Sequence, residues 1–187
     1  MEVIISSEPM DRQECQLVAA GFFEDERPLR GPAGLLDWRL NGAISREIIN
    51  GRITGRLKET VIIPSNSRIQ SPKILLIGLG SARRISYPKL REVSSHLLQT
   101  LLKINILDFC CSIPHSKPYP IECSKAVEVW VEGLADALDL RGKLSGEVRM
   151  RITEEDRFVD EALLGAQTAK VVLKQRMRVK VKQEVTS

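Results

Sequence analysis

Histidine, cysteine and aromatic residues are scarce in this sequence, and long apolar runs are missing. The 187 residues include two histidines and four cysteines, and 4% of them are aromatic. No apolar run approaches the roughly 18–20 residues that a membrane-spanning helix needs. Met1 leads directly into the strand-like residues 3–5, with no charged leader segment. We therefore expect a cytoplasmic protein that has no membrane partner.

The cysteines give little sign of a disulfide framework or a zinc site. Cys15, Cys110, Cys111 and Cys123 are too few and too irregularly spaced for either. Cys110 and Cys111 fall within the apolar run 106–113, where successive side chains of a strand point to opposite faces. Since free cysteine is often buried, we expect two small hydrophobic core residues here.

Candidate metal ligands and catalytic residues are equally sparse. His96 falls within a predicted helix and His115 within a proline-rich loop, and neither has a partner at metal-ligand spacing. The acidic run 154–156 coincides with the start of a predicted helix, where carboxylates interact favourably with the helix N-terminus. The sequence therefore predicts no catalytic residue, no metal site and no cofactor in this chain.

The charge balance is mildly basic. There are 28 Lys and Arg against 24 Asp and Glu, and the pI is about 9.0. Arg149, Arg151 and the alternating residues 176–182 could form a basic strip, but no aromatic residues interleave to stack bases. Nucleic acid is thus a secondary partner prediction. For the stretch 176–187 an edge strand, a disordered basic arm and a linker stub all remain open.

Strand-like and helix-like segments alternate along the chain, which predicts an α/β fold with helices on both faces of a mixed, mostly parallel sheet. The nearly continuous apolar segment 74–79 is expected near the sheet centre, and the alternating segment 148–152 near an edge. We predict strands at 3–6, 17–23, 59–63, 74–79, 106–113 and 148–152, and helices at 35–50, 88–104, 122–140 and 156–175.

Two sequence blocks carry a family resemblance. Residues 34–46 read GLLDWRLNGAISR, residues 73–80 read KILLIGLG, and a glycine turn at 51–55 and an apolar segment ending at Pro64 lie between them. In this order they resemble the N-terminal domain of the leucyl aminopeptidase (cytosol aminopeptidase) family. The resemblance implies a three-layer macro-like fold over residues 1–175, followed by a basic strand or tail at 176–187.

The same resemblance shapes the functional expectation. In that family the peptidase chemistry belongs to a separate C-terminal domain that binds manganese or zinc, and this sequence contains no such segment. We expect a stand-alone non-catalytic domain with an assembly or regulatory role. A homodimer is an open alternative, and so is one half of a split metalloaminopeptidase whose catalytic half is a separate chain. Some family members bind DNA through this domain.

A nucleotide or ADP-ribose site is the remaining alternative. Glycines after a buried strand let backbone N–H groups approach a phosphate, although a third glycine and a Gly-Lys-Ser/Thr sequence are missing here. Ordinary turn chemistry competes with this interpretation. The candidate ligand-binding residues are Gly78, Gly80, Ser81, Arg83 and Arg84, together with Asn66 after another strand.

Overall fold

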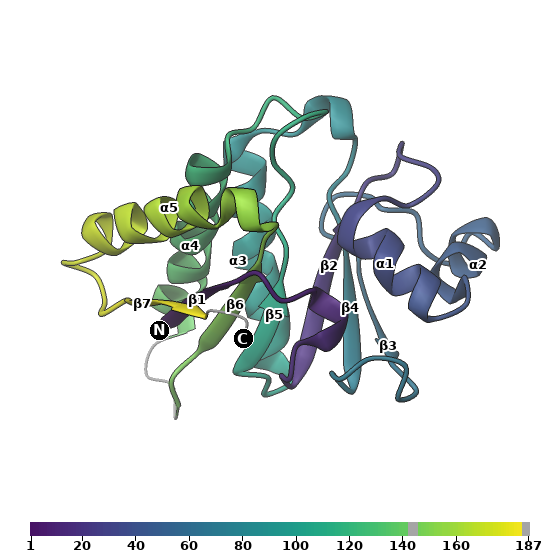
Figure 1. The fold of residues 1–187 in the computed structure, drawn as a ribbon, viewed down its shortest axis with the longest axis horizontal. Coiled ribbons are helices and arrows are strands. Elements are labelled where there is room, and N and C mark those ends of the chain that lie inside the picture. Colours follow the sequence, from purple (N-terminus) through teal and green to yellow (C-terminus); the bar gives the residue numbers. More distant parts are fainter. Residues whose placement is uncertain (142–145, 185–187) are drawn as a thin grey trace.

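A seven-stranded sheet with helices on both faces forms the domain (Figure 1). The computed structural model describes residues 1–141 and 146–184. The strand order is β3-β4-β2-β5-β6-β1-β7, in which β3 is antiparallel to β4 and the other neighbours are parallel. The strands are β1 (Glu2–Ser6), β2 (Leu17–Phe22), β3 (Thr60–Pro64), β4 (Lys73–Gly78), β5 (Asp108–Cys111), β6 (Arg149–Thr153) and β7 (Lys180–Glu184).

The helices form two layers. They are α1 (Gly31–Arg39), α2 (Ala43–Ile49), α3 (Tyr87–Lys103), α4 (Cys123–Arg141) and α5 (Val159–Val172). Helices α3, α4 and α5 cover one face of the sheet, and α1 and α2 cover the other (Figure 1). The predicted three-layer α/β fold is confirmed. Within the described residues, no helix has both the length and the apolar character needed to cross a membrane.

The two neighbouring cysteines follow the strand prediction. Cys111 belongs to the core beneath α3–α5, whereas Cys110 belongs to the core beneath α1 and α2. Their exposed fractions are 1% and 0%. Burial raises the pKa of both thiols. The prediction of two small buried side chains on opposite sheet faces is confirmed.

The predicted single helix at 35–50 is wrong, because the chain breaks it into α1 and α2. Asn41 and Gly42 between them have positive φ angles of 54° and 73°, a conformation that ends a right-handed helix. The Asp37 carboxylate then accepts a hydrogen bond from the Ser45 amide at 3.0 Å, which satisfies a free N–H group in the first turn of α2.

The strand predicted at 148–152 lies inside the sheet and not near its edge. β6 is flanked by β5 and β1. Its basic side chains meet carboxylates on those neighbours, with Arg149 Nε 2.8 Å from Glu2 Oε2 and Arg151 Nη1 2.6 Å from Asp108 Oδ1. The alternating pattern therefore reflects cross-strand ion pairs. Segment 74–79 becomes β4, which is buried on both faces but second from the edge.

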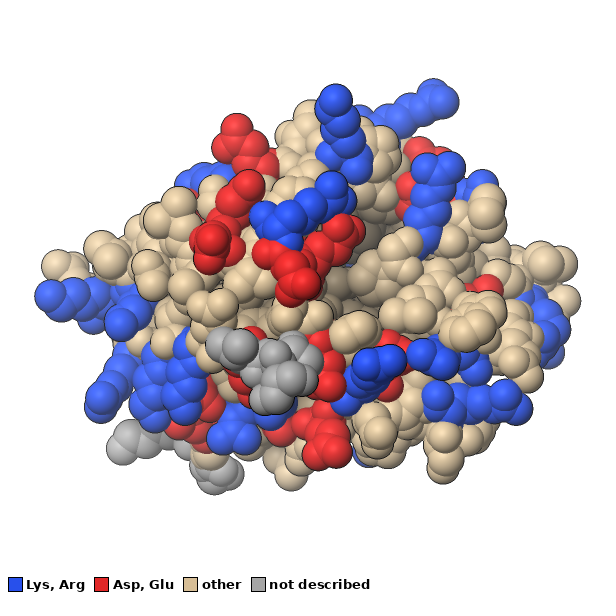
Figure 2. Space-filling view, in the orientation of Figure 1, with Lys and Arg blue, Asp and Glu red and all other residues tan. Residues whose placement is uncertain are grey.

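The C-terminal stretch forms the edge strand β7 beside β1, which is one of its three open alternatives. Its cations are also paired, since Lys180 lies 3.0 Å from Glu147 and Lys182 lies 2.7 Å from Glu2. Basic and acidic side chains are interspersed over the face in Figure 2. This pairing lowers the positive potential that the segment offers to phosphate groups.

The ion pairs of the Glu2 carboxylate should make the free energy of unfolding depend on pH. Lys182 and Arg149 hold the pKa of Glu2 at about 2, below its ordinary value of 4.5. The folded pKa is thus depressed, so the stabilisation is complete above pH 4.5 and is lost as pH falls toward 2. We expect Glu2→Gln to lower the free energy of unfolding at pH 7 by about 1 kcal/mol after solvent screening, and to flatten its decrease below pH 5 in urea titrations. The exposed Glu14→Gln is the control, and an equal effect there would contradict the assignment.

Candidate functional site

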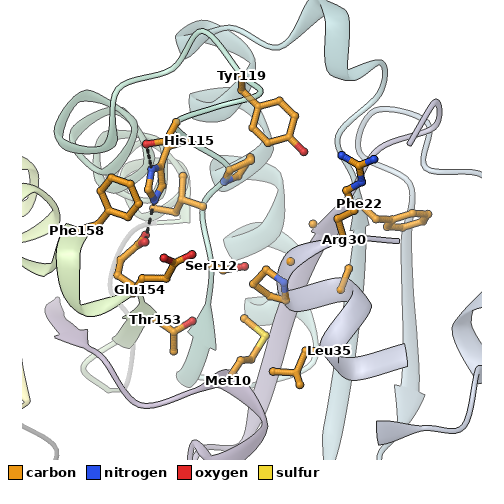
Figure 3. Close-up of a pocket in the computed structure, with 18 of the residues that line it drawn as sticks. Met10, Phe22, Arg30, Leu35, Ser112, His115, Tyr119, Thr153, Glu154 and Phe158 are labelled. Carbon is orange, nitrogen blue, oxygen red and sulfur yellow. Dashed lines mark hydrogen bonds and ion pairs between the residues drawn. The ribbon is translucent and has the colours of Figure 1, made fainter. Parts of the chain in front are cut away.

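The carboxyl ends of the parallel strands meet at one edge of the sheet, and the segments that follow them enclose a pocket of about 560 Å³ (Figure 3). Its walls come from the chain after β1, β2, β4, β5 and β6. The chain after β2 enters α1 on one face, whereas the chain after β4, β5 and β6 enters helices on the other face. Ligands of open α/β sheets bind at such a change of direction.

The N-terminus of α1 forms one wall of the pocket. Arg30, Gly31, Pro32 and Ala33 all line it. Pro32 stands in the first helical turn, where its missing N–H costs nothing. The amide of Gly34 makes the first intrahelical hydrogen bond, to Arg30 O at 3.1 Å. The amides of Gly31 and Ala33 precede that bond and give this wall partial positive charge.

Aromatic rings and charged groups complete the pocket. The Tyr119 ring lies 5.0 Å from that of Phe23, and its hydroxyl donates to Glu26 at 3.0 Å. Burial and the Glu26 carboxylate raise the pKa of Tyr119. The Arg157 guanidinium lies 4.7 Å from the centre of the Phe158 ring. The pocket therefore combines apolar surface with donors, acceptors and cations.

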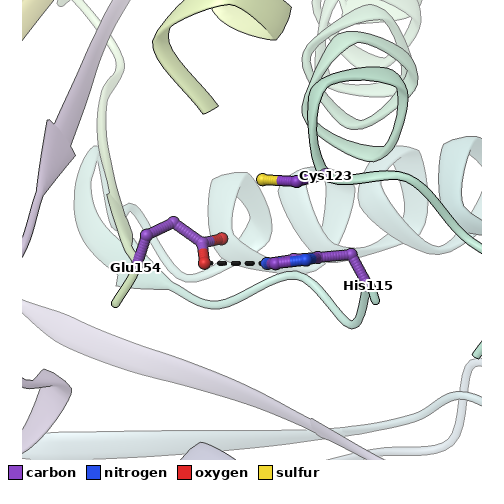
Figure 4. Close-up of side chains that lie close together, drawn as sticks. All are labelled: His115, Cys123 and Glu154. Carbon is purple, nitrogen blue, oxygen red and sulfur yellow. Dashed lines mark hydrogen bonds and ion pairs between the residues drawn. The ribbon is translucent and has the colours of Figure 1, made fainter. Parts of the chain in front are cut away.

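A buried polar pair lies on the wall built from the segments after β5 and β6. His115 Nε2 lies 2.8 Å from Glu154 Oε2, and His115 Nδ1 lies 2.9 Å from Ser116 Oγ. The Phe158 ring packs edge-on against the imidazole at 4.8 Å. Burial raises the pKa of Glu154. The ligand atoms of His115, Glu154 and Cys123 lie within 4.8 Å of one another (Figure 4).

This cluster corrects the prediction for Glu154, whose side chain turns into the protein with an exposed fraction of 6%. Asp156 does lie where helical structure begins, in the first turn of the 3-10 helix Asp156–Phe158 that precedes α5. Sequence spacing missed the cluster because its members are 8 and 31 residues apart along the chain. A topological signal could have revealed the cluster, because His115 and Glu154 lie in the segments after β5 and β6, which are neighbouring strands of the sheet.

The glycine motif predicted as a ligand site lies beside the pocket. Leu79 lines the pocket, but Gly80 and Ser81 are not among its lining residues. The Asp25 carboxylate accepts hydrogen bonds from the Ser81 hydroxyl and, at 2.7 Å, from the Ala82 amide. These bonds lower the pKa of Asp25. A carboxylate of the same chain thus holds the position that an anion would take at this loop.

Of the remaining predicted residues, only Asn66 lies apart from the glycine loop. Arg83 and Arg84 are exposed, and Arg84 lies 3.5 Å from Glu24. Asn66 follows β3, whose last residue Pro64 pairs with Lys73 at the beginning of β4. It therefore lies at the opposite end of β4 from Gly78. The structure brings Gly78, Gly80, Ser81, Arg83 and Arg84 together but leaves Asn66 apart from them.

Solved structures share this fold. A macrodomain variant from Oceanobacillus iheyensis matches with a TM-score of 0.66 and 12% identity, over 92% of this chain and 93% of that one. A Trypanosoma brucei macrodomain in complex with ADP gives 0.68 and 10% identity over 86% and 67%. A tomato leucine aminopeptidase variant gives 0.65 and 16% identity over 92% and 37%. The domain therefore has a macrodomain-like fold.

The family follows from the sequence comparison. Residues 19–140 match the N-terminal domain of the cytosol aminopeptidase family. A probable cytosol aminopeptidase from Cyanothece sp. is 27% identical over 86% of this chain and 32% of its own length. One from Pseudomonas syringae is 25% identical over 73% and 27%. The chain belongs to this family, as the resemblance predicted, and spans about a third of the length of these relatives.

Proposed function

We propose that this domain has a non-catalytic, regulatory role, which it exerts by binding a nucleotide or ADP-ribose in the pocket at the carboxyl ends of its strands. The observation that carries the proposal is the pocket itself. Its volume of about 560 Å³ suits a ligand of that size. Its position matches the general site of open α/β sheets.

The chemistry of the pocket walls suits a phosphorylated ligand. The N-terminal amides of α1 and the Arg30 side chain present donors and positive charge to a phosphate. The rings of Phe22 and Tyr119 offer apolar surface for a base, and the Glu26 carboxylate can accept from ribose hydroxyls. One solved structure of the same fold is a complex with ADP, which supports this ligand class.

Binding experiments with Arg30 variants test the proposal. We expect ADP-ribose or ADP to bind saturably in calorimetric titrations, and Arg30→Glu to weaken binding about tenfold or more, since a lost charged hydrogen bond costs about 1.5–3 kcal/mol. Ser112→Phe, which fills the pocket, should abolish binding. The exposed Arg30 side chain makes an effect of its substitution on folding small.

The doubly substituted chain Arg83→Glu, Arg84→Glu distinguishes the two candidate sites. It retains binding if the pocket is the site. Binding that is lost in this chain but unchanged in Arg30→Glu would place the ligand at the Gly78–Arg84 loop. No binding at millimolar ligand would refute both sites.

Family membership favours a second role, in the assembly or regulation of a metallopeptidase. The relatives that this chain matches are about three times its length. Among the residues that the structure describes, the one cluster of three candidate ligands is His115, Cys123 and Glu154, too few for a pair of ions. A two-metal peptidase centre does not fit the described part of this domain. Mixing the protein with a separately produced cytosol aminopeptidase catalytic domain tests the role, and an unchanged oligomer size and leucyl-substrate turnover of that domain would refute it.

A further inference from the structure

Three side chains of different chemistry meet behind the pocket wall. His115 comes from the segment after β5, Cys123 is the first residue of α4, and Glu154 follows β6. Their ligand atoms lie within 4.8 Å of one another, and Figure 4 shows Cys123 beside the His115–Glu154 pair. The side-chain exposed fractions of His115 and Glu154 are 7% and 6%, and Cys123 is 1% exposed.

One oxygen of this cluster has no partner among the residues that the structure describes. Glu154 Oε2 interacts with His115, but Glu154 Oε1 is fully buried and accepts no hydrogen bond from that part of the chain. A buried carboxylate oxygen left unsatisfied is costly and calls for a bound ion or water. On the other side of the ring, Ser116 Oγ lies at hydrogen-bond distance from His115 Nδ1. When Nδ1 donates to Ser116, Nε2 presents the lone pair that a metal binds.

We infer that His115 Nε2, Cys123 Sγ and a Glu154 carboxylate oxygen bind one zinc ion. Nitrogen, thiolate sulfur and carboxylate oxygen are the protein ligands of zinc, whereas magnesium and calcium prefer oxygen alone. Tetrahedral zinc at its usual bond lengths places its ligands roughly 3.2–3.8 Å apart. Glu154 Oε2 lies 2.8 Å from His115 Nε2 and the three ligand atoms lie within 4.8 Å of one another, so ion binding would require the Glu154 oxygen to move away from His115 and any wider pair to close.

Two of the three proposed ligands border the pocket. His115 and Glu154 line the pocket, and Cys123 is not among its lining residues. Zinc sites with three protein ligands take water or a ligand group in the fourth position. The inference is independent of the proposed nucleotide binding, because the ion alone is the probe in the test below.

A catalytic thiol is the competing interpretation of the same three residues. A nucleophilic cysteine needs partial exposure. Cys123 is instead 1% exposed. Its sulfur also faces the backbone oxygen of Phe158 at 3.9 Å. A buried sulfur that shares a site with an imidazole and a carboxylate fits a metal ligand better than a nucleophile.

Cobalt and zinc titrations of the chelator-treated protein, residues 1–187, test the inference. We expect one cobalt ion per chain, with tetrahedral visible absorption and a thiolate-to-metal charge-transfer band, both removed by one equivalent of zinc. Cys123→Ser should eliminate the charge-transfer band. Glu154→Gln should weaken zinc binding by about tenfold or more, and Ser116→Ala by about tenfold. Cys15→Ser is the matched control and should change neither band nor affinity.

Folding and metal binding are separated by two further measurements. Circular dichroism in chelator shows whether each variant folds, and Glu154→Gln keeps the side-chain volume. In the unsubstituted protein, zinc should slow alkylation of Cys123 and leave that of Cys15 unchanged, as read by mass spectrometry. A charge-transfer band that persists in folded Cys123→Ser, or zinc affinity that is unchanged in folded Glu154→Gln, would overturn the inference. Alkylation of Cys123 at the same rate with and without zinc would do so too.

Discussion

Substitution of Gly133 by valine should unfold the domain or lower its free energy of unfolding by about 4 kcal/mol or more. Gly133 lies where α4 crosses α3, and a Cβ atom there would overlap the backbone oxygen of Arg91 and the hydroxyl of Ser94. A backbone oxygen cannot rotate away, so the two helices must separate. Overpacking of this kind costs more than the usual 1–3 kcal/mol because it opens the core that these helices cover.

Urea denaturation followed by circular dichroism measures the effect. Leu140→Val, which places the same β-branched side chain at an exposed position of α4, is the control and should cost less than about 1 kcal/mol. Equal stabilities of the two variants would show that α3 and α4 do not approach so closely.

Truncation of Trp130 to alanine should cost about 3–5 kcal/mol. This side chain is 1% exposed and packs within the core beneath α3, α4 and α5. Its removal leaves a large cavity that the surrounding helices fill only in part. Thermal and urea denaturation give the loss, and tryptophan fluorescence should lose its buried component.

The second tryptophan supplies a matched control. Trp38 is 68% exposed on α1, where its ring lies 4.8 Å from the Arg39 guanidinium. Trp38→Ala should therefore cost no more than about 1 kcal/mol, the value of an exposed cation–π contact. A larger loss for Trp38 than for Trp130 would contradict the assignment of the core.

The sequence predicted the elements better than their arrangement. Apolar periodicity located the strands and most helices within a few residues, because burial of one face imposes it. It did not reveal that Asn41 and Gly42 divide α1 from α2, since the apolar repeat continues through them. It also misplaced β6, because Arg149 and Arg151 alternate as they would at an edge but pair with neighbouring strands.

The site was harder to predict than the fold. The glycines at 78 and 80 resemble a phosphate loop, which is why the sequence predicts a ligand site there. In the structure, Asp25 and Glu24 of the same chain bind that loop. The pocket beside it is assembled from segments far apart in sequence, none of which carries a motif. His115 and Glu154 lie close together because β5 and β6 are neighbouring strands, and the sequence does not show that pairing.

The binding site that we propose for this domain is the pocket between α1 and the segments after β5 and β6. Backbone amide shifts in nitrogen-15-labelled protein, recorded during a titration with ADP-ribose, test this assignment. We predict saturable shifts at Gly31 and Ala33 and within residues 112–119, 153–155 and 157–158, all of which border the pocket. Shifts confined to the Gly78–Arg84 loop, or no shifts at millimolar ligand, would contradict the claim.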